Sequence, residues 1–431
     1  MKSFPPIVFL MLLFVATSLQ GQVSKTEIRL TKYIDQHNNE ALQLLEEIIN
    51  INSGTMNFDG VKAVADVLMP KFKALGMEVE WKDGSAWNRA GHLVAKTTAG
   101  KGKKILLIGH LDTVFELESP FQKYKVLNDS TASGPGIADM KGGDVIILQA
   151  LSALNNAGLL KDMSITVVMT GDEELSGDPL SLSKQELVEA AKWADIALGF
   201  ENGDGNPGTA NVARRSSSGW TLKVTGNAAH SSQVFKPEVG AGAIYETARI
   251  LTGFYEALST EEYLTFNPGM ILGGTNVAYE ESIDGGRATG KSNVVAKDAV
   301  VTGDIRTISP EQLQRTQKTM TEIVAKHLPK TNATISFDEG YPPFAPTEGN
   351  YELLKQLSKV STDLGFMPVE PVNPSNAGAA DISFTSPYIE MGLDGLGMGG
   401  KNDHTVNETG DLKVLPMQTK RAAVLLYRLT R

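Results

Sequence analysis

The chain has 431 residues, of which 41% are hydrophobic and 21% are charged, and its formal net charge is −10. This ordinary globular composition excludes whole-chain disorder, collagen and a coiled coil, and the length suggests two or three domains. The sequence has no cysteine, which excludes disulfides, thiolate zinc sites and a cysteine nucleophile, so histidines and carboxylates would have to hold any metal. The acidic balance argues against nucleic acid as a partner.

The first 21 residues have the order of a secretory signal peptide. Lys2 precedes an apolar run at residues 7–15, small polar residues follow, and cleavage is expected after Ser18 or near Gly21. The run is short for a bilayer span, although an uncleaved anchor or a buried N-terminal helix is an alternative. No second hydrophobic span follows and no cysteine can carry a lipid. We therefore expect a periplasmic or secreted protein without a stable membrane anchor.

The elements expected within residues 22–213 alternate between helices and strands. Apolar residues at helical spacing predict helices over 27–51, 61–75, 143–154 and 184–194. Short apolar segments such as KILLIG predict strands over 77–81, 104–109, 164–170 and 195–200. This alternation is typical of βαβ units, so we expect an α/β fold with a mainly parallel sheet and helices on both faces.

After about Arg214 the pattern changes. Strands are expected over 220–225, 299–306 and 334–338, and helices over 241–258 and 312–327, which together can form a small α+β domain. An α/β pattern then resumes, and an amphipathic helix over 414–429 would close the main sheet. The prediction is therefore a catalytic domain made of residues 22–213 and 342–431, interrupted by an inserted domain at residues 214–341.

Polar residues with chemical capacity follow the predicted strand KILLIG. His110 and Asp112 come directly after it, and ligand sites in open α/β sheets form outside the carboxyl ends of the strands. His110 can bind a metal while Asp112 orients a neighbouring group. On its own such a pair is weak evidence, because a histidine at a strand end is more often an ordinary polar residue.

Four further segments add carboxylates and a second imidazole. Asp139 lies in the glycine-rich GPGIADMKGG, where it can also be interpreted as a helix cap. Glu173 and Glu174, in TGDEELSG, form either a solvated acidic loop or a metal ligand beside a general base. Glu201 follows the strand DIALGF, and His404 lies in GGKNDHTVNE. Two imidazoles and three carboxylates suit two dications, with zinc favoured and cobalt or manganese left open.

The chain resembles the M20 family of dizinc metallopeptidases and amidohydrolases, especially its glutamate carboxypeptidase-like members. The resemblance covers essentially the whole mature chain and rests on five segments in the family's order and spacing, GHLDTVF, GPGIADMKGG, TGDEELSG, GFENGDG and KNDHTVNE. It implies that His110 and Glu201 hold one zinc ion and that Glu174 and His404 hold the other. Asp139 would bridge the two ions.

The resemblance also implies catalytic roles outside the metal ligands. Asp112 would orient His110, and Glu173 would be the general base. His230, in GNAAHSSQ, matches the family's lid histidine, which the partner subunit often supplies. Without that match it is better interpreted as a surface-loop histidine. Residues 214–341 would form a lid, which in many members also builds the interface of a homodimer.

Substrate recognition is expected to involve a free carboxylate next to the scissile amide. Arg306, in TGDIRT, matches an arginine that can clamp this carboxylate with two parallel hydrogen bonds. Asn293, in KSNVVAKD, matches a lid asparagine that contacts the substrate, and Gly378, in NAGAAD, would approach it on the opposite wall. Each of the three can also be an ordinary strand or loop residue.

One position departs from the best-known glutamate-releasing carboxypeptidase of the family. That enzyme has aspartate at the fourth ligand position, whereas Glu201 follows the choice of several deacylases. The sequence thus predicts a zinc-dependent metallo-carboxypeptidase that acts on small peptides or N-acyl amino acids. An N-acyl-amino-acid deacylase or a dipeptidase of the same family is the alternative. The intact base Glu173 and the complete ligand set argue against an inert peptide-binding protein.

Overall fold

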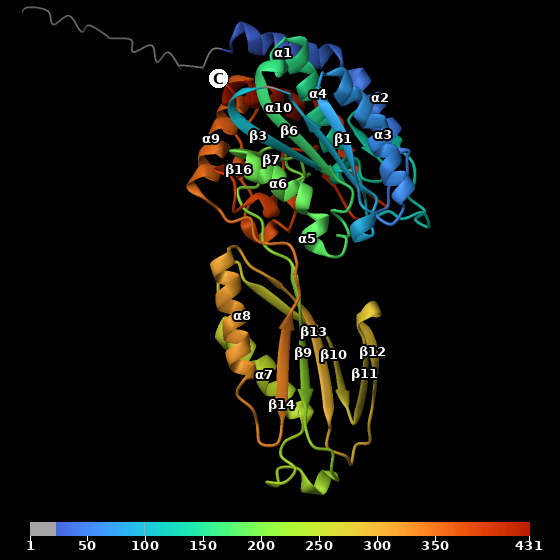
Figure 1. Cartoon of the computed structure of the whole chain (residues 1–431), viewed down its shortest axis with the longest axis vertical. Coiled ribbons are helices and arrows are strands. Elements are labelled where there is room, and N and C mark those ends of the chain that lie inside the picture. The colour runs from blue at the N-terminus through green and yellow to red at the C-terminus, as the bar shows by residue number, and fades with distance from the viewer. Residues whose placement is uncertain (1–22, 99) are drawn as a thin grey trace, which may run out of the picture.

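The computed structural model describes residues 23–98 and 100–431, which form a larger and a smaller unit (Figure 1). The larger unit contains a six-stranded sheet, and the smaller unit contains a four-stranded sheet with a core of its own. The predicted signal peptide at residues 1–21 lies outside the described residues and stays a prediction. Within the described ranges, no helix combines the length and the apolar character needed to cross a membrane.

The sheet of the larger unit has the strand order β1-β2-β6-β3-β7-β16. Its strands are β1 (Glu78–Asp83), β2 (Gly91–Lys96), β3 (Lys101–His110), β6 (Met163–Thr170), β7 (Ile196–Gly199) and β16 (Met391–Leu393). The pairs β6–β3, β3–β7 and β7–β16 are parallel, whereas β1 and β2 add an antiparallel edge. The prediction of a mainly parallel sheet is confirmed.

The helices of the larger unit are α1 (Lys25–Gln36), α2 (Asn38–Ile49), α3 (Phe58–Ala74), α4 (Gly142–Asn156), α5 (Leu180–Ser183), α6 (Gln185–Trp193), α9 (Glu348–Asp363) and α10 (Val414–Leu429). The helix expected over 27–51 is two helices, because the chain leaves helical geometry at His37. The His37 ring stacks on Tyr33 and its Nδ1 lies 2.8 Å from the Tyr33 carbonyl oxygen. Helix α9 was not expected.

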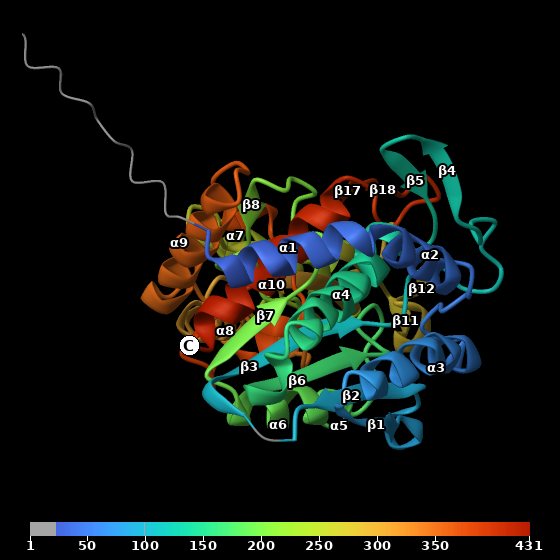
Figure 2. The same cartoon turned by 90° about the horizontal axis from the view of Figure 1, so that it is seen from above.

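The central strands are buried on both faces, which explains their continuous apolar sequences. In β3, Ile105 and Leu107 belong to one hydrophobic core, and Leu106 and Ile108 belong to another. Side chains alternate along a strand, so each face needs its own apolar set. Figure 2 shows α1, α4 and α10 over one face of the sheet and α6 on the other. The prediction of helices on both faces is confirmed.

The sheet of the smaller unit has the order β10-β13-β9-β14 and is antiparallel throughout. Its strands are β9 (Ser218–Thr225), β10 (Thr265–Gly274), β13 (Asp298–Arg306) and β14 (Asn332–Phe337), and β11 (Asn276–Glu280) and β12 (Gly285–Thr289) form a hairpin beside it. Helices α7 (Ala243–Leu258) and α8 (Pro310–Val324) pack on the sheet, where Trp220 meets Phe254 edge to face. The unit is α+β as expected, although β10 and the hairpin were not predicted.

Two short sheets complete the larger unit. Their strands are β4 (Lys125–Asn128), β5 (Thr131–Ser133), β17 (Gly400–Lys401) and β18 (Thr409–Asp411) in one, and β8 (Thr209–Ala210) with β15 (Glu370–Pro371) in the other. The antiparallel pair of β18 with β5 places Thr409 opposite Ser133. Segments that are far apart in the sequence thereby become neighbours.

The chain passes between the two units twice, and the two crossings are hydrogen-bonded to each other. Arg214 pairs with Phe344, and Ser217 pairs with Tyr341, through backbone hydrogen bonds of 2.9 to 3.0 Å. The domain boundaries predicted at 213/214 and 341/342 fall within these crossings, and their exact positions stay a prediction.

Candidate metal centre

The five predicted metal ligands come from five segments and meet at one edge of the six-stranded sheet. His110 ends β3, Glu174 follows β6 and Glu201 follows β7, so three ligands leave the carboxyl ends of neighbouring parallel strands. Asp139 lies in the turn before α4, and His404 lies between β17 and β18. This edge is where open α/β sheets form their ligand sites.

Asp139 lies between the two histidines. Its Oδ1 is 3.1 Å from Nε2 of His110, and its Oδ2 is 3.0 Å from Nε2 of His404. Each of these nitrogens also faces a second carboxylate. Nε2 of His110 is 3.4 Å from Glu201 Oε1, and Nε2 of His404 is 3.2 Å from Glu174 Oε2. The result is two pairs of a glutamate and a histidine that share one aspartate. They are the pairs that the resemblance implies, and the assignment of ions to them stays a prediction.

The charges of this cluster favour cations between the ligands. Burial, reinforced by the charge of Asp139, raises the pKa of Glu201 to about 8 and that of Glu174 to about 7. Hydrogen bonds to Asp139 and Glu174 raise the pKa of His404 to about 11. The raised pKa values of the two glutamates reflect repulsion between crowded, buried negative charges. Bound cations would offset this repulsion. Imidazole and carboxylate ligands in this arrangement fit zinc, and two sets of them fit two ions.

Asp403 is a candidate ligand that was not predicted from the sequence. The ligand atoms of Asp139, Asp403 and His404 lie within 4.8 Å of one another. Asp403 is exposed and directly precedes His404 in the segment KNDHTVNE. Its position in that segment was the one available signal.

Glu173 belongs to the same cluster, with its carboxylate within 4.8 Å of ligand atoms of His110 and Glu201. Burial, followed by the charge of Glu201, raises the pKa of Glu173 well above its ordinary value. The backbone N–H of Glu173 donates to Asp112 Oδ1 at 3.1 Å, and its carbonyl accepts from the Tyr341 hydroxyl at 2.9 Å. A held carboxylate with a raised pKa beside metal-binding side chains can exchange a proton with a reacting group.

Asp112 is fully buried and contacts the loop of Glu173 and Glu174 as well as His110. Its Oδ1 is 3.4 Å from Nδ1 of His110, and its Oδ2 accepts from the Glu174 N–H at 3.2 Å. The Thr55 hydroxyl donates to the same Oδ2 at 2.7 Å. Such a carboxylate orients the imidazole and makes it a stronger ligand. The sequence contained no signal for Thr55, because its contact depends on a turn 57 residues away.

Glu408 supports the turn that carries Asp139 and was not predicted from the sequence. Its buried carboxylate accepts hydrogen bonds from the backbone N–H groups of Gly136, Ala138 and Asp139 at 2.9 to 3.2 Å. Burial raises the pKa of Glu408 to about 7. Glu408 lies in the same short segment as His404, so one segment contributes both a predicted ligand and a support for another.

Asp394 supports Glu201 in a similar way. Its Oδ1 accepts from the Glu201 N–H at 3.4 Å, and its Oδ2 pairs with Arg214 Nε at 2.5 Å. A Cβ on Gly199 would come within 2.2 Å of Asp394 Oδ1, so only glycine fits at the end of β7. Arg214 is buried in this pair and therefore connects the first crossing to the metal centre.

The structure does not bring the predicted lid residues His230 and Asn293 to the metal centre. The two lie near each other, since the Ser231 N–H donates to the Asn293 carbonyl at 2.9 Å. His230 is exposed, and its Nδ1 is 2.9 Å from Ser232 Oγ. In Figure 1 the segment between β9 and α7 lies at the end of the smaller unit remote from the larger unit. Among the described residues, no hydrogen bond or ion pair joins His230 or Asn293 to the cluster.

Arg306 and Gly378 lie near the crossings between the units. Arg306 ends β13 and pairs with Asp304 at 3.1 Å. Burial, followed by the charge of Arg306, lowers the pKa of Arg215, so two guanidinium groups are close together here. The Gly378 carbonyl accepts from Arg214 Nη1 at 3.1 Å, and a Cβ at Gly378 would meet no atom within 4 Å. Packing therefore does not require glycine at that position.

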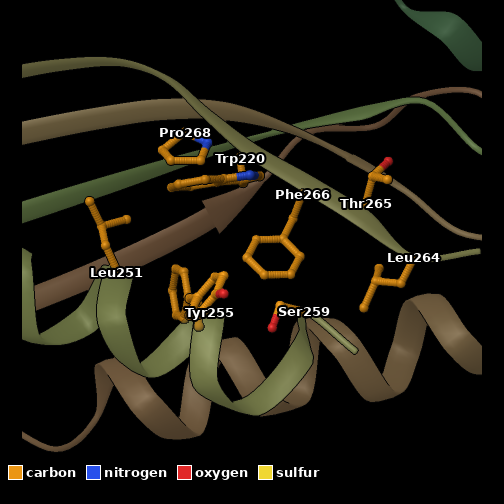
Figure 3. Close-up of a pocket in the computed structure, with 9 residues that line it drawn as sticks. Trp220, Leu251, Tyr255, Ser259, Leu264, Thr265, Phe266 and Pro268 are labelled. Carbon is orange, nitrogen blue, oxygen red and sulfur yellow. The ribbon is translucent and has the colours of Figure 1, made fainter. Parts of the chain in front are cut away.

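A separate apolar pocket of about 310 Å³ lies in the smaller unit beside α7 and β10 (Figure 3). Its lining residues are Trp220, Leu251, Phe254, Tyr255, Ser259, Leu264, Thr265, Phe266 and Pro268. None of the predicted site residues lines it, so it is not the site that the sequence predicts.

Comparison with known proteins places this geometry in a family. Residues 106–428 match the peptidase family M20/M25/M40. The chain belongs to this family. Membership makes the chain a hydrolase of peptide or amide bonds in a metal-dependent family, and the cluster around Asp139 is its candidate metal site.

Two relatives show the range of activities among similar sequences. The chain is 27% identical to carboxypeptidase G2 of Pseudomonas sp. (strain RS-16) over 394 residues, which cover 90% of this chain and 89% of the relative. It is 24% identical to the succinyl-diaminopimelate desuccinylase of Dechloromonas aromatica over 397 residues, which cover 87% and 94%. The structure of aminopeptidase PepT from Bacillus cereus matches with a TM-score of 0.69 at 17% identity, over 91% of this chain and 99% of that one, which supports the fold.

Proposed function

We propose that the chain is an exported, zinc-dependent M20 hydrolase that cleaves the amide bond of small peptides or N-acyl amino acids next to a free carboxylate. The observation that carries the proposal is the position of Asp139 between the two imidazoles, with Glu173 in the same cluster. The likeness to carboxypeptidase G2 supports a carboxypeptidase. The proposal includes two zinc ions per chain and release to the periplasm or the medium.

The roles of the side chains follow from their positions. Two dications bound by this donor set would lower the pKa of water and polarise the scissile carbonyl. The Glu173 carboxylate accepts the proton of the attacking water and later returns it to the leaving amine. Asp112 keeps both the His110 ring and the Glu173 peptide in place, so that the base and the ligand stay aligned.

A deacylase is the second candidate, and Glu201 with the desuccinylase likeness favours it. The two candidates differ in the acyl group that is cleaved from the amine. It is a peptidyl group for a carboxypeptidase and a simple acyl group, such as succinyl, for a deacylase. A panel of dipeptides, N-acyl amino acids and benzoyl- or folyl-glutamates, tested with the purified mature protein, separates them. We expect cleavage that a chelator abolishes and zinc restores, confined to substrates with a free carboxylate. Turnover that survives removal of all metal would contradict the proposal.

Arg306→Ala is expected to raise KM for carboxylate substrates by roughly ten- to a hundredfold, because a charge-assisted pair contributes about 1.5–3 kcal/mol. The kcat should change little, since the clamp binds a part of the substrate that does not react. Steady-state kinetics with a free-acid substrate and its C-terminal amide check this. Arg315→Ala is the matched control, because Arg315 pairs with Glu261 on the surface of the smaller unit. An equal effect on the amide substrate would remove Arg306 from this role.

His230 is proposed to complete the site of a partner subunit in a homodimer, since its own chain leaves it exposed and away from the cluster. His230→Ala and Glu173→Gln should each be nearly inactive alone. Mixed and allowed to exchange subunits, they should regain about one quarter of the wild-type activity, because half of the dimers are mixed and each has one intact site. Activity measured before and after exchange checks this. No recovery in a sample shown to contain mixed dimers would contradict the shared site.

A further inference from the structure

The side chain of Tyr341 connects the crossings between the units to the loop that contains Glu173. Tyr341 belongs to the returning crossing, and its backbone exchanges hydrogen bonds of 2.9 and 3.0 Å with Ser217 of the outgoing crossing. Its hydroxyl lies 2.9 Å from the Glu173 carbonyl, 3.1 Å from Ser176 Oγ and 3.2 Å from Asp381 Oδ1. A phenol has one hydrogen to donate, and the Glu173 carbonyl is the nearest acceptor. Ser176 can donate to the phenol oxygen in turn.

The surroundings of Tyr341 are rigid. Its ring packs against Phe384 with centroids 4.9 Å apart, and the Lys184 ammonium lies 5.3 Å from the ring centre. Lys184 is buried and bridges two buried carboxylates, Asp172 at 3.1 Å and Asp381 at 3.0 Å. Such a paired, buried charge is costly to displace once formed. The side chain of Tyr341 is therefore held in place by residues of the larger unit.

The peptide of Glu173 is consequently held from both directions. Asp112, which contacts His110, accepts from its N–H, and Tyr341 donates to its carbonyl. Asp172, the residue before it, is fixed by Lys184 and by the Ser183 hydroxyl at 2.6 Å. Of these contacts, the one with Tyr341 comes from a crossing between the units. The backbone pairing of Tyr341 with Ser217 thus connects the loop of Glu173 to both crossings.

We propose that Tyr341 is a positioning residue whose hydroxyl aligns the peptide of Glu173 and links that alignment to the orientation of the smaller unit. The inference rests on the proposed function, because Glu173 acts as a base only if the chain is a hydrolase. The hydrogen bond of Tyr341 thereby couples the position of the Glu173 peptide to the paired crossings that attach the smaller unit.

Tyr341→Phe tests the hydroxyl alone, because the ring contacts with Phe384 and Lys184 remain. With the best substrate of the panel, kcat should fall about five- to tenfold, the scale of one lost hydrogen bond, while KM stays within about twofold. The metal content should remain that of the wild type. Tyr351→Phe is the matched control, since Tyr351 is an exposed tyrosine of α9 and the hydrogen bonds to the loop of Glu173 come from Tyr341 instead, and it should leave both constants unchanged.

Hydrogen exchange of the full-length mature protein gives a second readout that needs no substrate. In Tyr341→Phe, the amides of residues 171–177 and 214–217 should exchange several-fold faster than in the wild type, while those of β9 and β13 are unchanged. Faster exchange in these two segments supports the link even if no panel substrate is cleaved, so failure of the proposed function is recognised separately. Unchanged kcat, a loss of metal, an equal loss in Tyr351→Phe, or unchanged exchange in both segments would each overturn the inference.

Discussion

Glu173→Gln is expected to lower kcat by roughly 10³-fold, within the range that a positioned general acid or base contributes. The amide keeps the size of the side chain and cannot accept the proton of water. The metal ions should remain bound, because the proposed ligand pairs use Glu174 and Glu201 instead. Substrate affinity should change little, since Glu173 acts on the water. Rapid-mixing kinetics together with elemental analysis of the purified variant measure both effects.

The control for Glu173→Gln is Glu189→Gln, an exposed residue of α6 that pairs with Lys192. It should retain wild-type kcat. The acid limb of the pH profile provides a further check: the base must be ionised, so activity falls as pH decreases through its pKa. Glu173→Gln should lose that limb in its residual activity. A variant that keeps full turnover, or one that loses metal together with activity, would remove Glu173 from the role of base.

Asp139→Asn is expected to lose at least one metal ion per chain and to lower kcat/KM by roughly 10³-fold or more. Asp139 presents a different oxygen to each imidazole, Oδ1 to His110 and Oδ2 to His404. Asparagine keeps one oxygen and replaces the other with an NH₂ group, which cannot bind a cation. Loss of metal assistance to the transition state is worth several kcal/mol, and each 1.36 kcal/mol is tenfold in rate.

Metal content by mass spectrometry and activity across a zinc titration check Asp139→Asn. Asp129→Asn, in the exposed turn between β4 and β5, is the control and should behave as the wild type. Asp403→Asn adds a graded comparison, because Asp403 lies beside His404 without touching the other imidazole. If Asp139→Asn bound two ions with wild-type affinity, the shared position of the aspartate would have no role in metal binding.

The prediction of a mainly parallel sheet is confirmed, because the signal for each buried strand lies in a few consecutive residues. KILLIG and SITVVMT are apolar at consecutive positions, and a strand covered on both faces requires that pattern. The strand β10 was missed for an equally local reason. The strand contains Pro268 and Gly269, which normally interrupt strands. These two residues are tolerated because β10 is an edge strand with an irregular register at that point.

The convergence of the candidate ligands could be predicted in part, because His110 ends one parallel strand and Glu174 and Glu201 follow two others. Strands β6, β3 and β7 are neighbours and run in one direction, so residues after them share an edge. His404 had no such basis in the sequence. It reaches Asp139 because β18 pairs with β5 and so brings the loop before it to the turn before α4. Only the family resemblance connected His404 to the other ligands.

By itself, the sequence determined the type of fold and the chemical character of the site, because strand burial, helix spacing and the donor atoms depend on residues close together along the chain. The tertiary structure decided which groups support the ligands and how the units are connected. Thr55, Glu408 and Tyr341 contact the site from segments 57, 269 to 272 and 168 residues away. Contacts over such separations depend on strand order and on the path of the crossings, which no local pattern of side chains specifies.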